Sequence, residues 1–237
     1  MSSQLLKKVF TGEVNRRNLP LAYYKKTLAQ MGGSLRRGFG SKGKLKWLYE
    51  DLQDNVSLFS AAKTYQLTRE LQLAKKGVKS FDDYVEKAMP ILNKYKSWGE
   101  AEATTITAQA QQAKQWQSII ADADIFPKLQ YSTVGDACRI CKPLDGIVAP
   151  VGAVIWTKFA PVNHYNCFCI LMQVENSVRS SSETKINSAY QNADENTSDV
   201  FKHNAGITHE AFNKEHPYFD IPKKDRGFAK RNFDLPI

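Results

Sequence analysis

The segments DACRIC (residues 136–141) and NHYNCFC (residues 163–169) contain all four cysteines of the chain. In the first segment, Cys138 and Cys141 form a C-x-x-C pair, a spacing that lets one turn direct both sulfur atoms toward a shared ion. Cysteines so closely grouped predict a common site, and we expect this site to organise the fold of the surrounding chain.

The second segment contributes His164, Cys167 and Cys169 in the pattern H-x-x-C-x-C. On an extended chain, Cys167 and Cys169 point to the same face. A structural zinc ion takes four sulfur or nitrogen ligands, and five candidates are present. The ligand set is therefore either all four cysteines or three of them with His164. The 22-residue loop between Cys141 and His164 is compatible with such a structural site.

Two other states of these cysteines compete with a structural metal. The thiols could stay reduced and pack as small hydrophobic groups, or they could pair as disulfides in an oxidising setting. A catalytic zinc is disfavoured because it keeps an open position and usually recruits an acid or base. Asp145 lies nearby, but in the sequence LDG it is better explained by turn formation.

Length and composition restrict the class of protein. The chain has 237 residues, enough for one large or two modest domains. It has no apolar run long enough to span a membrane, so we expect no membrane partner. The N-terminus lacks the long apolar stretch of a signal peptide, and we expect synthesis in a cytosol that keeps thiols reduced.

The positive charge is concentrated at the N-terminus. Residues 1–48 contain eleven Lys or Arg and one acid, Glu13, whereas the remaining residues carry 22 basic and 23 acidic side chains. We expect residues 1–43 to form an extended basic arm that suits DNA or an acidic protein surface. A solvated extension that only aids solubility fits the same composition. The candidate contact residues are Lys7, Lys8, Arg16, Arg17, Lys25, Lys26, Arg36, Arg37, Lys42, Lys44 and Lys46.

Helical patterns precede the cysteines. A short helix is expected over residues 21–31, ended by the glycine pair at 32–33. Within the predicted helical region, residues 44–125, apolar side chains recur at helical spacing over residues 45–74. The sequence Lys-Lys-Gly at 75–77 is a typical signal for the end of a helix.

Two further helices are expected before the cysteine segments. Ser80 with Asp83 resembles a capping box that starts one of them, in which Pro90 is expected to cause a kink. The next is expected over residues 99–122. Together these patterns predict a helical hairpin or small bundle, with its aromatic residues in the core.

The cysteine region, residues 126–176, has strand patterns. Residues 129–133 alternate like a strand, residues 146–156 are β-like but broken by a proline and a glycine, and residues 169–175 are typical of a buried strand. Residues 177–237 are expected to be a linker and an extended, aromatic tail that covers either its own domain or a neighbour. The predicted fold class is therefore α+β, a helical part followed by a small cysteine-rich β domain.

A metal-dependent nuclease is the main enzymatic alternative. Nucleases of the HNH type also combine cysteine pairs with histidine. They usually need a second C-x-x-C and a separate His–Asn–His centre, and this chain has only one such pair. His203, His209 and His216 are scattered through the tail without a matching pattern.

The cysteine region resembles the head-morphogenesis (Mu F-like) family of minor head proteins of tailed bacteriophages. The resemblance covers roughly residues 44–175 and is most specific around the two cysteine segments. One departure is Phe168, since the family usually has Arg between the last two cysteines. The matching positions are Tyr131, Thr133, Asp136, Cys138, Cys141, Leu144, Asp145, Gly146, Trp156, Pro161, His164, Cys167 and Cys169.

The resemblance implies a low-copy structural protein of the phage head, made in the host cytoplasm and present in the virion. It implies association with the portal protein and with the major capsid or scaffold protein, and a role in head assembly and DNA packaging or delivery. Packaged DNA is then the partner expected for the basic arm. Enzymatic activity is not a general property of the family, so we expect none here.

Overall fold

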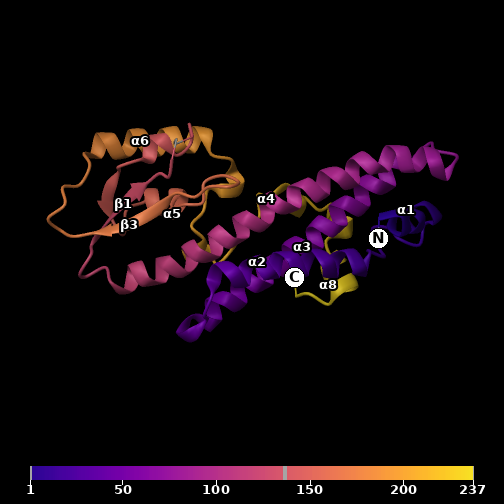
Figure 1. Cartoon of the computed structure of the whole chain (residues 1–237), viewed down its shortest axis with the longest axis horizontal. Helices are drawn as coiled ribbons and strands as arrows, with labels where there is room; N and C mark the ends of the chain where they lie inside the picture. Colours follow the sequence, from indigo (N-terminus) through magenta and orange to yellow (C-terminus); the bar gives the residue numbers. More distant parts are fainter. Residues whose placement is uncertain (1, 136–137, 237) are drawn as a thin grey trace. The chain divides into compact units, whose positions relative to one another are not determined.

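The protein is described by a computed structural model that covers residues 2–135 and 138–236 (Figure 1). Within these residues the chain is mainly helical and has an antiparallel sheet in the strand order β2-β1-β3, which confirms the α+β class. None of the helices described is long and apolar enough to cross a membrane. The helices are α1 (Ser2–Thr11), α2 (Leu21–Phe39), α3 (Lys46–Ala74), α4 (Phe81–Ala121), α5 (Ile155–Phe159), α6 (Glu183–Asn196), α7 (Ala205–Thr208) and α8 (Phe228–Phe233), and the strands are β1 (Lys128–Ser132), β2 (Val148–Pro150) and β3 (Ile170–Val174).

The chain forms two units, each assembled from segments that are far apart in the sequence. The helical unit contains Met1–Gly33, Val56–Ala103 and His216–Ile237, and the cysteine unit contains Ser34–Asn55 and Thr104–Glu215. The sequence suggested consecutive regions instead. The difference arises because α3 and α4 each supply residues to both units.

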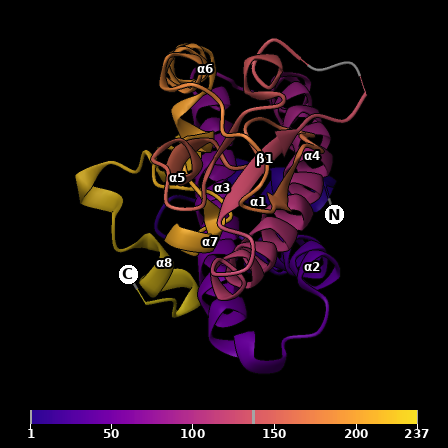
Figure 2. The same cartoon turned by 90° about the vertical axis from the view of Figure 1, so that its left-hand side faces the viewer.

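The sheet forms the centre of the cysteine unit. Leu129 of β1 lies opposite Ala149 of β2 and Gln173 of β3. Figure 2 shows β1 between the end of α4 and α5. Side chains from all these elements share one buried cluster, which removes a large apolar area from water. The cluster includes Trp116 and Ile119 of α4, Leu129 and Tyr131 of β1, Trp156 and Phe159 around α5, and Ala189 and Ala193 of α6.

The C-terminal segment packs against its own units, which answers the question that the sequence left open. Phe201 and Phe212 are buried in the cysteine unit, where Asn55 donates a hydrogen bond to the carbonyl of Phe212. Gly206 lies so close to Trp116 that a β-carbon there would be 2.3 Å from the Cβ of Trp116. This close approach requires glycine.

The prediction that residues 1–43 form an extended arm is wrong. Most of this segment is helical, because it contains α1 and α2. The glycine pair at 32–33 does not end α2. Met31, Leu35 and Phe39 are fully or almost fully buried at four-residue spacing. Their burial contributes more than the roughly 1 kcal/mol that each helical glycine costs, so the helix continues to Phe39.

Other helix predictions are partly confirmed. The helix before Lys75 ends at Ala74, as predicted, and Gly77 has a φ of +72°. Ser80 accepts a hydrogen bond from the Asp83 N–H at 3.1 Å, which confirms the predicted cap. The two helices expected after Ser80 form a single helix, α4. Pro90 lies inside α4 and does not end it.

The strand predictions are also partly confirmed. β1 matches the predicted strand, but residues 146–156 form only the short β2 and the start of α5. β3 is not a buried strand, because Ile170 and Met172 are exposed and only Leu171 is fully buried. An antiparallel sheet can leave one face to solvent, and β3 is an edge strand.

The helical unit contains a buried ion pair between two of its helices. Lys63 of α3 and Glu102 of α4 are each 2% exposed, and the Lys63 ammonium donates to Glu102. The hydroxyl of Tyr218, from the C-terminal segment, donates to the same carboxylate at 2.8 Å. Burial lowers the pKa of Lys63, although Glu102 opposes this shift. The pair therefore joins three separate segments through one carboxylate.

Removing one partner of this pair is expected to destabilise the protein strongly. Lys63→Met leaves the Glu102 carboxylate buried without a counter-charge, and we expect a loss of about 3–5 kcal/mol in the free energy of unfolding. The double variant Lys63→Met, Glu102→Gln keeps an acceptor for Tyr218 and removes that charge, so it should recover more than half of the loss. Urea unfolding measures both values, and a single-variant loss below about 1 kcal/mol contradicts the assignment.

The stability of the helical unit is expected to fall in mild acid. Burial, with a smaller effect from the Lys63 charge, lowers the pKa of His216 from 6.5 to about 4. Between these two values the unfolded chain binds a proton that the folded chain excludes, so stability decreases as the pH falls. His216→Gln cannot titrate but can still accept the Tyr218 N–H.

The test compares urea unfolding of the wild type and of His216→Gln between pH 7 and pH 4. The wild type should lose up to about 3 kcal/mol relative to the variant over this range. Parallel pH profiles for the two proteins would show that His216 is not the group responsible.

A candidate metal centre of four cysteines and a histidine

The first cysteine segment forms a tight turn. The backbone N–H groups of Cys141 and Lys142 both donate to the carbonyl of Cys138, at 3.1 and 2.9 Å. After this turn, Leu144 is buried, and the Asp145 carboxylate accepts the Thr133 N–H at 2.9 Å. Asp145 lies in a turn, as predicted, and Gly146 after it has a φ of +67°, but the Asp145 carboxylate bonds the residue that follows β1.

The second cysteine segment turns just before β3. The Cys167 N–H donates to the carbonyl of His164 at 3.2 Å, and Asn166 has a φ of +58°. Asparagine accepts this left-handed conformation more readily than most residues. This turn places Cys167 in the core and leaves Phe168 exposed.

The two segments bring their ligand atoms together. The Sγ atoms of Cys141 and Cys167 are 3.9 Å apart. The described ligand atoms form two groups of three, each within 4.8 Å: an outer triad of Cys138, Cys141 and His164, and an inner triad of Cys141, Cys167 and Cys169. Cys141 belongs to both triads. All five predicted ligands are thus gathered at one place, where they could hold a metal ion.

The separation of the sulfur atoms fits a tetrahedral ion. A zinc–sulfur bond of about 2.3 Å places two sulfur ligands of a tetrahedron roughly 3.8 Å apart. The observed distance of 3.9 Å between the Sγ atoms of Cys141 and Cys167 is close to this expected sulfur–sulfur separation. Thiolate and imidazole ligands also exclude hard ions such as calcium and magnesium, which prefer oxygen.

His164 is oriented to present one nitrogen to the site. Its Nδ1 lies 2.8 Å from the carbonyl oxygen of Tyr165. A carbonyl only accepts hydrogen bonds, so Nδ1 carries the proton and Nε2 keeps its lone pair. Nε2 lies 3.2 Å from the Sγ of Cys138. An imidazole held through its other nitrogen in this way is typical of a metal ligand.

A second layer of side chains supports the inner triad. The fully buried hydroxyl of Tyr131 donates to the Sγ of Cys141 at 3.3 Å, and the Asn163 amide donates to that hydroxyl at 3.0 Å. The sequence analysis predicts no role for Asn163, and it places Tyr131 only in an expected strand and among the positions of resemblance. Position is the only signal for these two residues in the sequence. Asn163 directly precedes His164, and Tyr131 lies in the strand before the first cysteine turn.

The thiols differ in their tendency to ionise. The hydrogen bond donated by Cys141 lowers the pKa of Cys167, and the same interaction raises the pKa of Cys141. For Cys138, burial alone would raise the pKa, but backbone N–H groups and the nearby His164 together lower it. Burial and the neighbouring thiols raise the pKa of Tyr131, which stays protonated as a donor. At least one inner thiol is therefore favoured as the thiolate that a metal requires.

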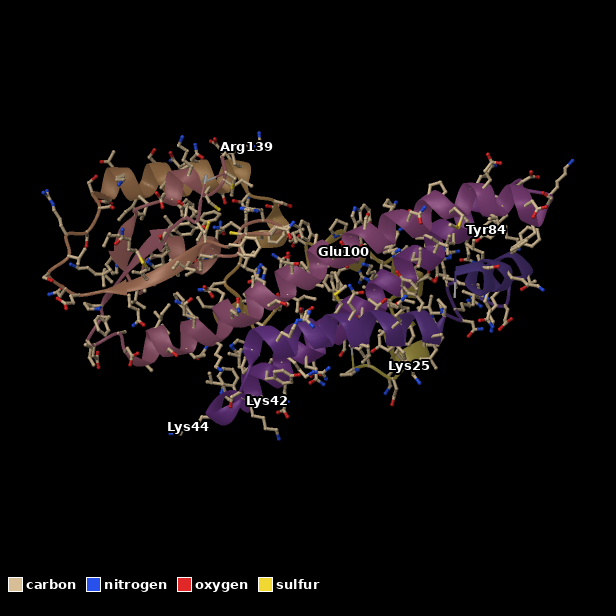
Figure 3. The ribbon with its side chains drawn as sticks, viewed as in Figure 1. Lys25, Lys42, Lys44, Tyr84, Glu100 and Arg139 are labelled. Atoms are coloured by element: carbon tan, nitrogen blue, oxygen red, sulfur yellow. The ribbon has the colours of Figure 1, made fainter. Side chains whose placement is uncertain are left out.

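The cysteines are free rather than disulfide-bonded. The 3.9 Å between Cys141 and Cys167 is about twice the length of a sulfur–sulfur bond. Arg139, between the two cysteines of the C-x-x-C turn, is exposed, as Figure 3 shows. Asp136, another position of the resemblance, lies outside the described residues.

The predicted basic contact residues do not form one arm. Lys7, Lys8, Arg16, Arg17, Lys25 and Lys26 belong to the helical unit, and Arg36, Arg37, Lys42, Lys44 and Lys46 belong to the cysteine unit. Most are exposed, and Figure 3 shows Lys42 and Lys44 extending from the turn before α3. Several have partners: Lys8 pairs with Glu13, Lys46 with Glu50, and Lys42 lies over the ring of Tyr49.

The three histidines of the tail have separate structural partners. His203 is buried and bonds the Glu210 carbonyl, and His216 accepts the Tyr218 N–H. His209 lies 2.9 Å from Asp51. Among the described residues, none of the three belongs to a group that could hold a metal.

Comparison with known proteins gives no family. No family model, curated protein or solved structure matches the chain.

Metal binding is expected to depend most on the shared ligand. Cys141→Ser removes a ligand from both triads, so we expect affinity for Zn²⁺ or Co²⁺ to fall on the order of 100-fold or more. Cys138→Ser leaves the inner triad complete and should weaken binding less. Competition titration with a chelator measures the affinities, and the Co²⁺ absorption spectrum reports thiolate coordination.

Tyr131→Phe serves as the matched control, because it keeps all five ligands and removes only the hydroxyl that reaches Cys141. We expect it to weaken binding by about 10-fold. Equal affinities for wild type and Cys141→Ser, with both proteins folded by circular dichroism, would contradict the shared role of Cys141.

Proposed function

We propose that this protein is a minor structural protein of a tailed-phage head, in which the cysteine unit is fastened by a structural zinc ion. The proposal combines the resemblance of residues 44–175 with one observation. The two cysteine segments, which carry the most specific part of that resemblance, bring five ligand atoms into two overlapping triads.

Zinc is the metal that best suits this ligand set. The inner triad consists of three thiols, of which Cys141 and Cys167 are buried. A fourth ligand would come from Cys138 or His164, which lie together on the outer side. A thiolate-rich, four-ligand site is typical of structural zinc, whereas catalytic zinc keeps an open position. When bound, the ion supplies a cross-link between the turn after β1 and the turn before β3.

The proposed partners are the portal protein and the major capsid or scaffold protein, with packaged DNA as a partner of exposed basic residues. Charge supports this proposal, because eleven of the 33 basic residues fall within the first 48 positions. Contacts of Lys and Arg with phosphates would be sensitive to salt and independent of sequence. The proposed location is the virion, after synthesis in the host cytoplasm, and no enzymatic activity is proposed.

The proposed function predicts zinc and portal association in the same protein. Protein purified without chelator should contain about one equivalent of zinc, since the site has one shared centre. It should also co-purify with portal rings when co-expressed with the portal protein of its genome. Elemental analysis and size-exclusion chromatography measure the two properties.

The control for charge uses substitution rather than deletion, because removing residues 1–43 would also remove the buried Leu6 and Leu35. Arg36→Gln with Lys44→Gln should weaken portal or DNA association and leave the zinc content unchanged. Less than a tenth of an equivalent of zinc would exclude the structural ion. Metal-dependent DNA cleavage that is lost in His164→Ala would instead support the nuclease alternative.

A further inference from the structure

The helical unit has a basic hollow on its surface. Two adjoining cavities, with volumes of about 330 and 450 Å³, share Arg16, Gln72 and Lys224 as lining residues. Asn15, Arg17 and Asp225 complete the first cavity, and Arg69, Leu73 and Lys76 complete the second. Three separate parts of the chain meet here: the loop after α1, the last turns of α3, and the segment before α8.

The charge of the hollow is strongly unbalanced. Its lining contains five cations and one acid, Asp225. Asp225 is 6% exposed and already accepts the Tyr65 hydroxyl at 2.6 Å and an Arg16 N–H at 3.4 Å. Burial and the hydrogen bond to Asp225 raise the pKa of Tyr65 to about 12, so the tyrosine remains a donor. Asp225, the only carboxylate among the described residues that line the hollow, thus holds Arg16 in place.

The other four cations have no carboxylate partner among the described residues. Arg69 is fixed by its contact with the Gln66 side chain, and Arg17 is tied through its carbonyl to Arg231. Cations that converge on a concave surface repel one another unless an anion binds between them. Arginine and lysine in such a cluster are the groups that recognise phosphate.

Gln72 adds a polar group suited to a phosphate ligand. Its Oε1 atom is buried and has no hydrogen-bond partner among the described residues. The other end of the same amide is an NH₂ group, which can donate to a phosphate oxygen.

We propose that this hollow, formed by Arg16, Arg69, Gln72, Lys76 and Lys224, is a binding site for a phosphate group. This proposal does not depend on the proposed function, because it rests on the helical unit alone. The phosphate could belong to a small molecule or to a nucleic-acid backbone. Both sources present the same chemistry to the site, and experiment distinguishes them.

The test compares two double variants of equal charge. Lys76→Gln with Lys224→Gln removes two exposed cations from the hollow, whereas Lys87→Gln with Lys96→Gln removes two exposed lysines from α4 in the same unit, outside the hollow lining. Inorganic phosphate and a short duplex DNA are titrated separately into each folded protein at fixed ionic strength. Calorimetry follows phosphate, and fluorescence anisotropy follows DNA.

We expect the hollow variant to weaken phosphate binding by about tenfold or more and the α4 variant to change it less than about twofold. A parallel loss for DNA identifies a nucleic-acid backbone as the source of the phosphate, and a loss for phosphate alone identifies a small phosphate ligand. Equal losses in both variants, or no saturable phosphate binding to the wild type, would overturn the site and leave only general charge attraction.

Discussion

The cysteine unit depends on the position of one thiol. Cys141 is buried in the apolar cluster of the sheet, and its sulfur belongs to both triads of ligand atoms. The turn that begins at Cys138 places it there, and the Tyr131 hydroxyl holds it from the neighbouring strand. The core and the candidate metal centre are therefore not separate features. A change that moves Cys141 alters the packing of β1 and the ligand geometry together.

Much of the site could be predicted because its signals are local. C-x-x-C spacing, the alternation of Cys167 and Cys169, and the LDG turn all act over a few residues. The supporting hydrogen bonds from Tyr131 and Asn163 could not be predicted, because they depend on a strand pairing and a loop that meet only in the folded chain. The choice of ligands also depends on how the two cysteine segments meet, so the sequence alone could not decide it. The structure groups the candidate ligands into an inner and an outer triad.

The errors in the fold have a common physical cause. Gly32, Gly33 and Pro90 carry strong local signals against a helix, yet helices continue through all three. At the glycines, the buried Met31, Leu35 and Phe39 contribute more than the glycines cost. Basic composition similarly suggested an extended arm, although Leu5, Leu6 and Val9 bury one side of α1. Tertiary packing outweighs local preference wherever apolar side chains recur at helical spacing.

The interleaving of the two units has a consequence for the order in which the chain can fold. Tyr65 and Asp225 are separated by 160 positions, and Glu102 and Tyr218 by 116. Because a ribosome releases the chain from its N-terminus, α3 and α4 emerge long before the segment that completes the helical unit. The cysteine unit, which ends at Glu215, can close earlier. Until residues 216–237 are translated, Lys63 and Glu102 have each other but lack the hydrogen bond from Tyr218, so this later segment completes the packing of α3 and α4 in the helical unit.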